Sequence, residues 1–323
     1  MLVVGGTGRV GRRVVTRLNA LGVRVRVLTR DPDSAAAAEL VAACVDTART
    51  LEMVRGDVVA DDAAGLRDAV AGCTQVVACF GAQRISKITD ALPFTRPDED
   101  DPAHPAAVNY RGVARLAAAA AEAGTVRRFV RVTGMSVGYP PMQIIAVLLN
   151  TVLSMTITWQ LRGEMAVRDC GVAYTVIRPG SLSDAPRPEG SVVLVGHSGA
   201  HVPAGKVSRD DVAELITLAT FSPRAENATI GIAGAARPTG GIRSEMSWDP
   251  ARGMHYRAVE VDETVMEGTD VGDMLQKVAG DVDALEEKNH APYVAAFVAL
   301  LAGVGVAAAR GALALVGHLF GAA

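Results

Sequence analysis

The chain has 323 residues, of which 50% are hydrophobic and 21% charged, and its formal net charge is -3. This length allows a large core in one or two domains, and the high hydrophobicity with low net charge excludes a disordered chain. The 32 basic residues do not exceed the 35 acidic ones, so the composition does not favour a nucleic-acid binder.

The first 180 residues alternate short apolar segments with helical ones. We expect strands at 2–4, 23–28, 52–54, 75–80, 128–133 and 174–177. We expect helices at 11–21, from residue 34, at 62–70, 106–123 and about 160–169. Such alternation predicts an α/β fold with a doubly wound parallel sheet, covered by helices on both faces.

A glycine-rich turn, Gly5-Gly6-Thr7-Gly8-Arg9-Val10-Gly11, follows the first strand and begins the first helix. In such a turn, Gly5 permits the tight bend, Gly8 lets backbone N–H groups approach a pyrophosphate, and Gly11 lets the helix pack on the strand. The helix N-terminus then offers its partial positive charge to the phosphates. We therefore predict a dinucleotide site that includes Thr7, Arg9 and Val10 as well as the three glycines.

The end of the second strand, Leu28-Thr29-Arg30-Asp31, bears on the choice between NAD and NADP. NAD-binding proteins usually place a carboxylate about 20 residues beyond the glycines. Arg30 can instead hold a 2′-phosphate by paired hydrogen bonds, and residues 1–30 contain seven arginines and no acidic residue. This favours NADP(H) over NAD(H). In the alternative, Asp31 binds the ribose and Arg30 is a surface residue.

No metal is expected. The four cysteines form no C-x-x-C pair, which argues against a disulfide scaffold or a zinc ribbon and favours a reducing compartment. His197 and His201 are four residues apart in a loop-like stretch, but a structural zinc needs four ligands.

The segment 144–157 is apolar but short for a membrane span, so we expect a helix that covers the ligand cleft. Beyond Gly180 we expect strands at 191–195 and 229–233, and a helix that Ser208 caps with Asp211 at its third position. The predicted division is a dinucleotide-binding domain at 1–234 that includes a small lobe at about 181–234, a polar irregular or helical extension at 235–292, and a hydrophobic helix at 293–320.

We expect no cleavable signal peptide within the given sequence. At the other end, residues 293–309 contain no charge. Arg310 interrupts this run, and apolar residues continue to Gly317. A bilayer span needs about 20 apolar residues. One interpretation is a membrane anchor at 293–317 with Arg310 near the interface; the other is an Ala-rich helical hairpin that packs on the protein or on a partner.

Six stretches resemble the NmrA-like NAD(P)H-binding branch of the atypical short-chain dehydrogenase/reductases (SDR). They are VVGGTGRVGRRVV, VRGDV at 54–58, VVACFGAQ at 76–83, VNYRGV at 108–113, RRFVRVTGMS at 127–136 and AYTVIRPGSL at 173–182. The similarity covers about residues 1–233. The stretch from Trp159 to Asp184 is most similar to chloroplast and cyanobacterial members, some of which are photosystem assembly or maturation factors.

The resemblance implies a Rossmann fold with a small C-terminal substrate lobe, and a plastid protein associated with the thylakoid. It also implies further cofactor contacts. Asp57 and Val58 would lie at the adenine, and Phe80, Gly81 and Ala82 at the ribose. The residues near the nicotinamide would be Thr133, Pro179, Gly180, Ser181 and Leu182.

The sequence departs from the family at the catalytic pair. Active members use Tyr-x-x-x-Lys, and the corresponding positions here are Thr156 and Gln160. The pKa of a threonine hydroxyl is far too high for it to replace the tyrosine in that proton transfer, and a glutamine has no charge. Glu164 and Arg162, on the same predicted helix, are an alternative acid and anchor, although a structural ion pair explains them as well.

Two functions follow from these observations. The first is a binding protein that holds NADP(H) as a structural or redox-sensing ligand and acts through a protein partner at a membrane, as an assembly or regulatory factor. The second is an NADPH-dependent oxidoreductase or isomerase that acts on an apolar small molecule, with the cofactor supplying the hydride. The missing Tyr/Lys pair and the apolar tail favour the first.

Overall fold

The computed structural model describes residues 1–60, 63–82, 101–197, 202–203, 205–236, 242–249, 253–260, 264–282 and 285–303. For 242–249 and 253–260 it describes the backbone alone. His201, most of the acidic run 98–101, and the part of the apolar tail beyond residue 303 lie outside the described residues.

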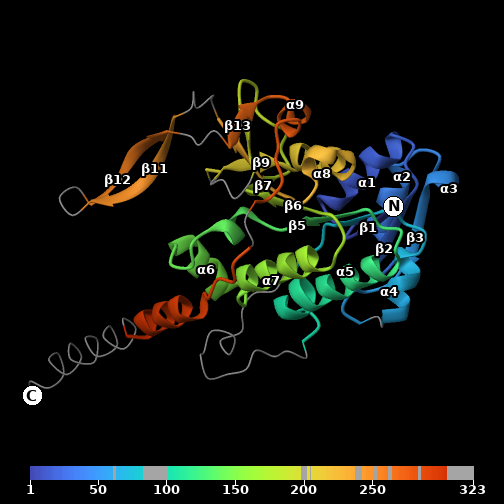
Figure 1. The fold of residues 1–323 in the computed structure, drawn as a ribbon, viewed down its shortest axis with the longest axis horizontal. Helices are drawn as coiled ribbons and strands as arrows, with labels where there is room; N and C mark the ends of the chain where they lie inside the picture. Colours follow the sequence, from blue (N-terminus) through green and yellow to red (C-terminus); the bar gives the residue numbers. More distant parts are fainter. Residues whose placement is uncertain are drawn as a thin grey trace, which may run out of the picture.

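A nine-stranded sheet forms the centre of the molecule (Figure 1). Its strands, in spatial order, are β13 (Val265–Gly268), β8 (Val192–Gly196), β10 (Ala228–Ala235), β6 (Tyr174–Pro179), β5 (Arg128–Val132), β4 (Gln75–Ala78), β1 (Leu2–Val4), β2 (Val25–Thr29) and β3 (Leu51–Arg55). The seven strands from β10 to β3 are parallel, while β8 is antiparallel to both of its neighbours. The predicted α/β fold with a doubly wound parallel sheet is confirmed.

The parallel strands are apolar because helices cover the sheet on both faces. In the central strand β1, all three residues are buried, and Val3 lies between Val27 of β2 and Val77 of β4. One face packs against α1 (Gly11–Ala20), α2 (Ala35–Ala42), α8 (Arg209–Phe221) and α9 (Val271–Leu275). The other packs against α4 (Ala63–Val70), α5 (Gly112–Glu122) and α7 (Thr156–Asp169). Figure 1 shows these two layers above and below the sheet.

Local sequence explains several helix boundaries. The predicted cap of α8 is confirmed, because Oγ of Ser208 accepts a hydrogen bond from the Asp211 backbone N–H at 3.0 Å. The predicted helix 106–123 is present as a π-helical segment, η2 (Ala106–Arg111), that leads into α5. Within the range predicted as a small lobe, β7 (Ser181–Ser183) pairs in parallel with β9 (Lys206–Ser208). The short helix α3 (Thr47–Thr50) precedes β3.

The apolar segment 144–157 is not one helix. Helix α6 (Ile144–Val152) ends in a turn where Ser154 and Met155 both have positive φ, and α7 then begins at an angle of 95°. Oδ1 of Asn150 accepts a hydrogen bond from the backbone N–H of Ile157 at 2.9 Å. Because this side chain serves the start of α7, α7 begins at Thr156, four residues before the predicted start.

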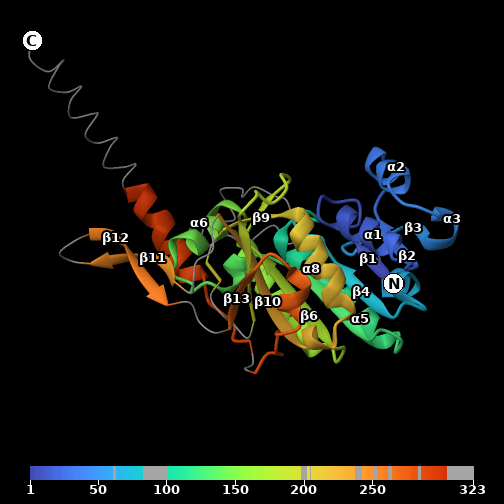
Figure 2. The ribbon, with the colours of Figure 1, turned by 90° about the horizontal axis from the view of Figure 1, so that it is seen from above.

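The segment 235–292, expected to be irregular or helical, contains regular strands. Strands β11 (Ile242–Asp249) and β12 (Gly253–Glu260) pair as an antiparallel hairpin that extends away from the sheet in both views (Figures 1 and 2). Downstream, β13 extends the main sheet and α9 packs against α8. The alternation of apolar and polar residues in IRSEMSWD is a strand signal that our interpretation of a polar stretch missed.

Candidate functional site

The glycine-rich turn lies at the point where the strand order reverses. It follows β1, and the loop after β4 begins beside it, so the carboxyl ends of these two adjacent parallel strands meet at one edge. Open α/β sheets bind their ligands at such a point. The sequence therefore places the predicted cofactor motif at the position where folds of this type bind their ligands.

The turn has the geometry of a phosphate-binding loop. Gly5 has a φ of +79°, and the backbone N–H of Gly8 donates to the carbonyl oxygen of Gly5 at 3.0 Å. A Cβ added at Gly11 would lie 2.1 Å from that same carbonyl oxygen, so only glycine allows the close packing of α1 on the turn.

Gly8 differs from the other two glycines. A Cβ added there would meet one atom within 4 Å, the carbonyl oxygen of Gly5 at 3.1 Å, and nothing else in the described structure. The protein itself therefore needs glycine at this position less than at Gly11. This is the pattern expected where the space above the turn is kept for a pyrophosphate, so the residues present fit a dinucleotide.

Arg9, Thr7 and Val10 surround the turn in different ways. The guanidinium of Arg9 pairs with Asp184 at 3.2 Å and is largely exposed. The Thr7 carbonyl oxygen accepts a 3.4 Å hydrogen bond from Nη2 of Arg12. Val10 is half-buried and already has helical backbone angles. Arg9 is therefore committed to an ion pair with the loop after β7.

The end of β2 leaves Arg30 available. Its side chain is exposed and has no hydrogen-bond or ion-pair partner in the described part of the chain. Asp31 is engaged, because its Oδ1 accepts a hydrogen bond from the Asp33 backbone N–H at 3.1 Å and lies 3.8 Å from Nη2 of Arg55. The carboxylate that would bind a ribose thus has local partners, whereas the guanidinium does not.

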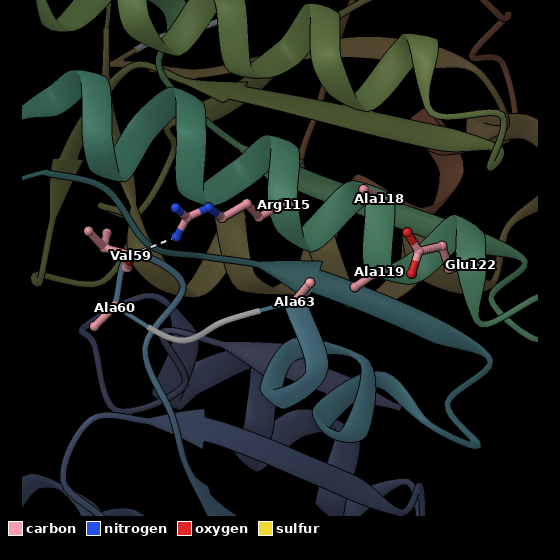
Figure 3. Close-up of a pocket in the computed structure, with 7 residues that line it drawn as sticks. All are labelled: Val59, Ala60, Ala63, Arg115, Ala118, Ala119 and Glu122. Atoms are coloured by element: carbon pink, nitrogen blue, oxygen red, sulfur yellow. Dashed lines mark hydrogen bonds between the residues drawn. The ribbon is translucent and has the colours of Figure 1, made fainter.

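Asp57 and Val58 lie in the turn after β3. Oδ1 of Asp57 accepts a hydrogen bond from the Val59 backbone N–H at 2.8 Å, and Val58 packs in the core beside Gly112. A surface pocket of about 340 Å³ adjoins this turn, between the start of α4 and α5 (Figure 3). Arg115 closes one side of it by donating to the Val59 carbonyl oxygen at 2.7 Å.

The loop after β4 is held by Asn109. Oδ1 of Asn109 accepts a hydrogen bond from the Ala82 backbone N–H at 2.9 Å, and its Nδ2 donates to the hydroxyl of Thr156 at 3.0 Å. Gly81 lies against the same amide oxygen. One buried asparagine thus connects the predicted ribose loop to the position where the family carries its tyrosine.

Arg131 supports the same loop from inside the sheet. It is fully buried, its Nη1 donates to the Phe80 carbonyl oxygen at 2.7 Å, and its guanidinium lies 4.9 Å from the centre of the Phe80 ring. Its Nε and Nη2 have no hydrogen-bond partner within the described residues. Burial lowers the pKa of Arg131 to about 10 and raises that of the neighbouring Cys79 thiol to about 12, so Cys79 is not a nucleophile at neutral pH.

Thr156 and Gln160 lie about one turn apart in the first part of α7. Thr156 is buried and its hydroxyl is occupied by Asn109. Gln160 is half-buried, and a Cβ added at Gly134, directly after Thr133, would lie 3.9 Å from its Oε1. The structure therefore brings together the two positions that the sequence identified, but with a neutral amide and a bonded hydroxyl.

Glu164 and Arg162 do not act together. Glu164 is fully buried: Arg178 donates to its two oxygens at 3.1 and 2.5 Å, and the Thr133 hydroxyl donates to it at 2.6 Å. Arg162 lies on the outer side of α7 and pairs with Glu287 at 2.8 Å. The two side chains therefore have separate partners: Arg162 forms a structural ion pair with Glu287, and Glu164 forms a buried one with Arg178.

The residues from Pro179 to Leu182 form a closely packed strand junction. The backbone N–H of Gly180 donates to the Ile232 carbonyl oxygen, and that of Ser181 to Gly205. A Cβ added at Gly180 would lie 2.4 Å from the Gly205 carbonyl oxygen. Just beyond Leu182, Asp184 pairs with three arginines and ties this junction to the first helix and to α8: Arg9, Arg13 and Arg209.

A C-terminal strap, defined here as residues 281–282 and 285–290, crosses the same face of the sheet as α7. Asp281 pairs with Arg168 at one end, and Lys288 donates to backbone carbonyl oxygens of the 3₁₀ turn η3 (Met135–Gly138) at the other. Nδ1 of His290 lies 3.2 Å from the Thr158 hydroxyl. The strap thereby connects α7 with η3.

Comparison with known proteins agrees with this geometry. A family model described as NAD(P)H-binding matches residues 5–223, which is more than half of the chain. This chain belongs to the NAD(P)H-binding atypical SDR family. An uncharacterised chloroplast protein of Arabidopsis thaliana is 30% identical over 218 residues, which cover 67% of this chain and 69% of that protein.

Other relatives are more distant. The chloroplast protein TIC 62 of Pisum sativum is 28% identical over 235 residues, which cover 69% of this chain but 40% of TIC 62. Among solved structures, a short-chain dehydrogenase/reductase of Veillonella parvula in complex with NADP has a TM-score of 0.53 and 16% identity, covering 74% of this chain and 97% of that one. The oxidoreductase ylbE of Lactococcus lactis has a TM-score of 0.52 and 16% identity, covering 74% and 94%. These two structures support the fold.

Four residues at the site were not predicted from the sequence: Asn109, Arg131, Arg178 and Lys288. The sequence could have indicated Arg131 and Arg178, because each is a charged residue inside a mostly apolar strand, RFVRV or YTVIRP. A buried charge in such a strand is normally paired or functional. Lys288 carried none, since more than a hundred residues separate it from the turn that it contacts.

Proposed function

We propose that this protein binds NADP(H) as a structural or redox-sensing ligand and acts through a protein partner, as an assembly or regulatory factor rather than as a dehydrogenase. The observation that carries the proposal is the pair Thr156 and Gln160. The Thr156 hydroxyl already accepts a hydrogen bond from Asn109, and Gln160 has no charge with which to lower the pKa of a proton donor.

The direct test is catalytic. Full-length protein with bound NADPH is mixed with a quinone and, separately, with an enone, and the nicotinamide absorbance is followed. We expect no oxidation above that of free NADPH. Thr156→Ala and Gln160→Ala should leave any residual rate unchanged. A loss of about a hundredfold, the scale of removing a general acid, would show an active site and favour the alternative, a reductase or isomerase.

Preference for NADP(H) over NAD(H) is supported by Arg30, which is exposed and has no partner among the described residues, and by the engagement of Asp31 with Asp33 and Arg55. Arg30→Ala should weaken NADPH binding about tenfold to a hundredfold and leave NADH binding nearly unchanged, because a charge-assisted contact contributes ~1.5–3 kcal/mol. Arg24→Ala, at an exposed arginine before β2, is the matched control. Equal affinities of the unmutated protein for NADPH and NADH would contradict the preference.

Plastid localisation and membrane association complete the proposal. The relatives named above include chloroplast proteins. The C-terminal helix Ala291–Gly303 exposes Leu300 and Leu301, and α6 exposes Ile144 and Val152, at the same end of the molecule (Figures 1 and 2). Within the described residues no single helix is long and apolar enough to cross a membrane, although the bent pair of α6 and α7 meets the length and composition criteria.

A further inference from the structure

A second cavity, of about 180 Å³, lies on the α7 face of the sheet. Its walls come from η3, from β6, β8 and β10, and from the C-terminal strap. It is separate from the glycine-rich turn, which β1 and α1 carry, and it is too small for a dinucleotide. Typical ligand pockets measure about 300–1,000 Å³, so a complete occupant of this cavity has only a few non-hydrogen atoms.

Two cationic side chains line this cavity. Arg178 is 8% exposed, and its Nε and Nη2 are both committed to Glu164. Its third nitrogen, Nη1, has no hydrogen-bond partner within the described residues, and a Cβ added at Gly138 would lie 3.3 Å from it. A guanidinium edge with no acceptor inside a cavity is a site that a ligand oxygen can satisfy.

Lys288 supplies the second positive charge. Its ammonium donates to the carbonyl oxygens of Val137, Gly138 and Tyr139 at 3.3, 2.8 and 3.3 Å, and it forms no ion pair in the described part of the chain. Burial and the charge of Arg178 lower its pKa. Glu164 neutralises one of the two cations, and none of the described residues that line the cavity is acidic. The cavity therefore has an excess of positive charge.

Much of the remaining wall is apolar, although Tyr139 and Thr229 also line the cavity. Met135, Val202 and Leu285 contribute side chains, and Gly196 and Gly231 contribute backbone. An anionic group at one end of the cavity and a short apolar chain along the rest match this lining. A carboxylate suits the geometry, because it accepts a hydrogen bond from a guanidinium nitrogen while its charge lies near the ammonium.

We propose that the cavity between η3, β6, β10 and the C-terminal strap binds a small organic carboxylate with a short apolar chain, through Nη1 of Arg178 and the charge of Lys288. This site goes beyond the proposed function, since the predicted cofactor contacts include neither Arg178 nor Lys288. It gives the protein a second small-molecule ligand on the surface where the strap crosses the sheet.

The experiment is ligand-observed NMR with the full chain and three probes: butyrate, its neutral isostere butyramide, and inorganic phosphate. We expect saturable butyrate binding and at least tenfold weaker binding of butyramide. Lys288→Met, which keeps the apolar stem and removes the charge, should weaken butyrate at least tenfold. The matched control is Lys277→Met, just after α9 and away from this cavity. This variant should bind butyrate like the unmutated protein.

A second variant keeps the test informative if Lys288→Met releases the strap. Gly138→Ala adds one methyl group beside Nη1 of Arg178 without requiring an unusual backbone conformation, and it should also abolish butyrate binding. NADPH affinity, measured on the same samples, should stay unchanged in both variants, which separates this site from the proposed cofactor site. Equal binding of butyramide, tighter binding of phosphate than of butyrate, or butyrate binding that survives both variants would overturn the proposal.

Discussion

At the scale of single residues, the two glycines Gly8 and Gly11 have different physical roles. A Cβ at Gly11 would lie 2.1 Å from a backbone oxygen, whereas a Cβ at Gly8 would meet one atom at 3.1 Å. We predict that Gly8→Val leaves a folded protein that no longer binds nucleotide, because the side chain occupies the pyrophosphate space. Gly11→Ala should instead lower the thermal stability. Calorimetric titration and thermal unfolding of both variants check this, and normal nucleotide affinity in Gly8→Val would contradict the site.

The buried ion pair of Glu164 and Arg178 should contribute to stability, since Glu164 is fully buried and balances the charge of Arg178. Glu164→Gln keeps the shape but leaves the guanidinium without a counter-charge, and breaking a buried pair in this way costs about 3–5 kcal/mol. Denaturant unfolding measures the free energy. The control is Glu287→Gln, which breaks the exposed pair with Arg162 and should cost less than about 1 kcal/mol. Similar losses in the two variants would show that the buried pair has no special role.

Among the elements, the C-terminal strap depends on a buried histidine. His290 is 1% exposed, and its Nε2 has no partner in the described structure. Burial lowers its pKa below the usual 6.5, so the folded protein favours the neutral ring. Stability from this group is therefore fully present above pH 6.5 and is lost as the pH falls below that value.

We predict that acidification from pH 7.5 to 5.5 lowers the melting temperature of the unmutated protein more than that of His290→Gln, which cannot be protonated. Melting curves at the two pH values give the comparison, and the other five histidines contribute equally to both proteins. If both proteins lose the same amount, His290 does not couple the strap to pH.

The C-terminal helix is the second element that we can test. Deletion of the residues after Pro292 removes this helix and the apolar tail but leaves the strap, whose last contact is made by His290. We predict unchanged NADPH affinity and a loss of binding to lipid vesicles, measured by flotation. A truncated protein that loses its nucleotide would show that the helix belongs to the core, as in the hairpin interpretation of the tail.

For the whole molecule, the main question is where the folding unit ends. The predicted domain boundary at 234 separates β10 from β13 and α9, but Val271, Met274, Leu275 and Val278 are buried in the same core as α8. We predict that a fragment of residues 1–234 aggregates or unfolds, because it exposes this apolar surface of the sheet and of α8. Size-exclusion chromatography and circular dichroism compare it with residues 1–292. A folded 1–234 fragment that binds NADPH would support the boundary at 234.

Local patterns in the sequence were enough for much of this fold. The alternation of apolar strands and helices predicted six of the parallel strands and the order of the helices between them, because a two-sided buried sheet imposes that pattern on every strand. The glycine spacing located the turn after β1, since the steric demands at Gly8 and Gly11 both come from the backbone of the turn itself. The capping contact of Ser208 is equally local.

Only the tertiary structure showed the polar contacts between residues that are far apart in the sequence. Asn109 reaches Thr156, Glu164 pairs with Arg178 rather than with Arg162, and Lys288 reaches η3 across about 150 residues of sequence. In each contact, tertiary packing determines which polar group becomes the partner. Local sequence periodicity therefore does not predict these pairs. The break between α6 and α7 was hidden for the same reason. The segment 144–157 is predominantly apolar and contains no glycine or proline, and the side chain of Asn150 determines where the second helix starts.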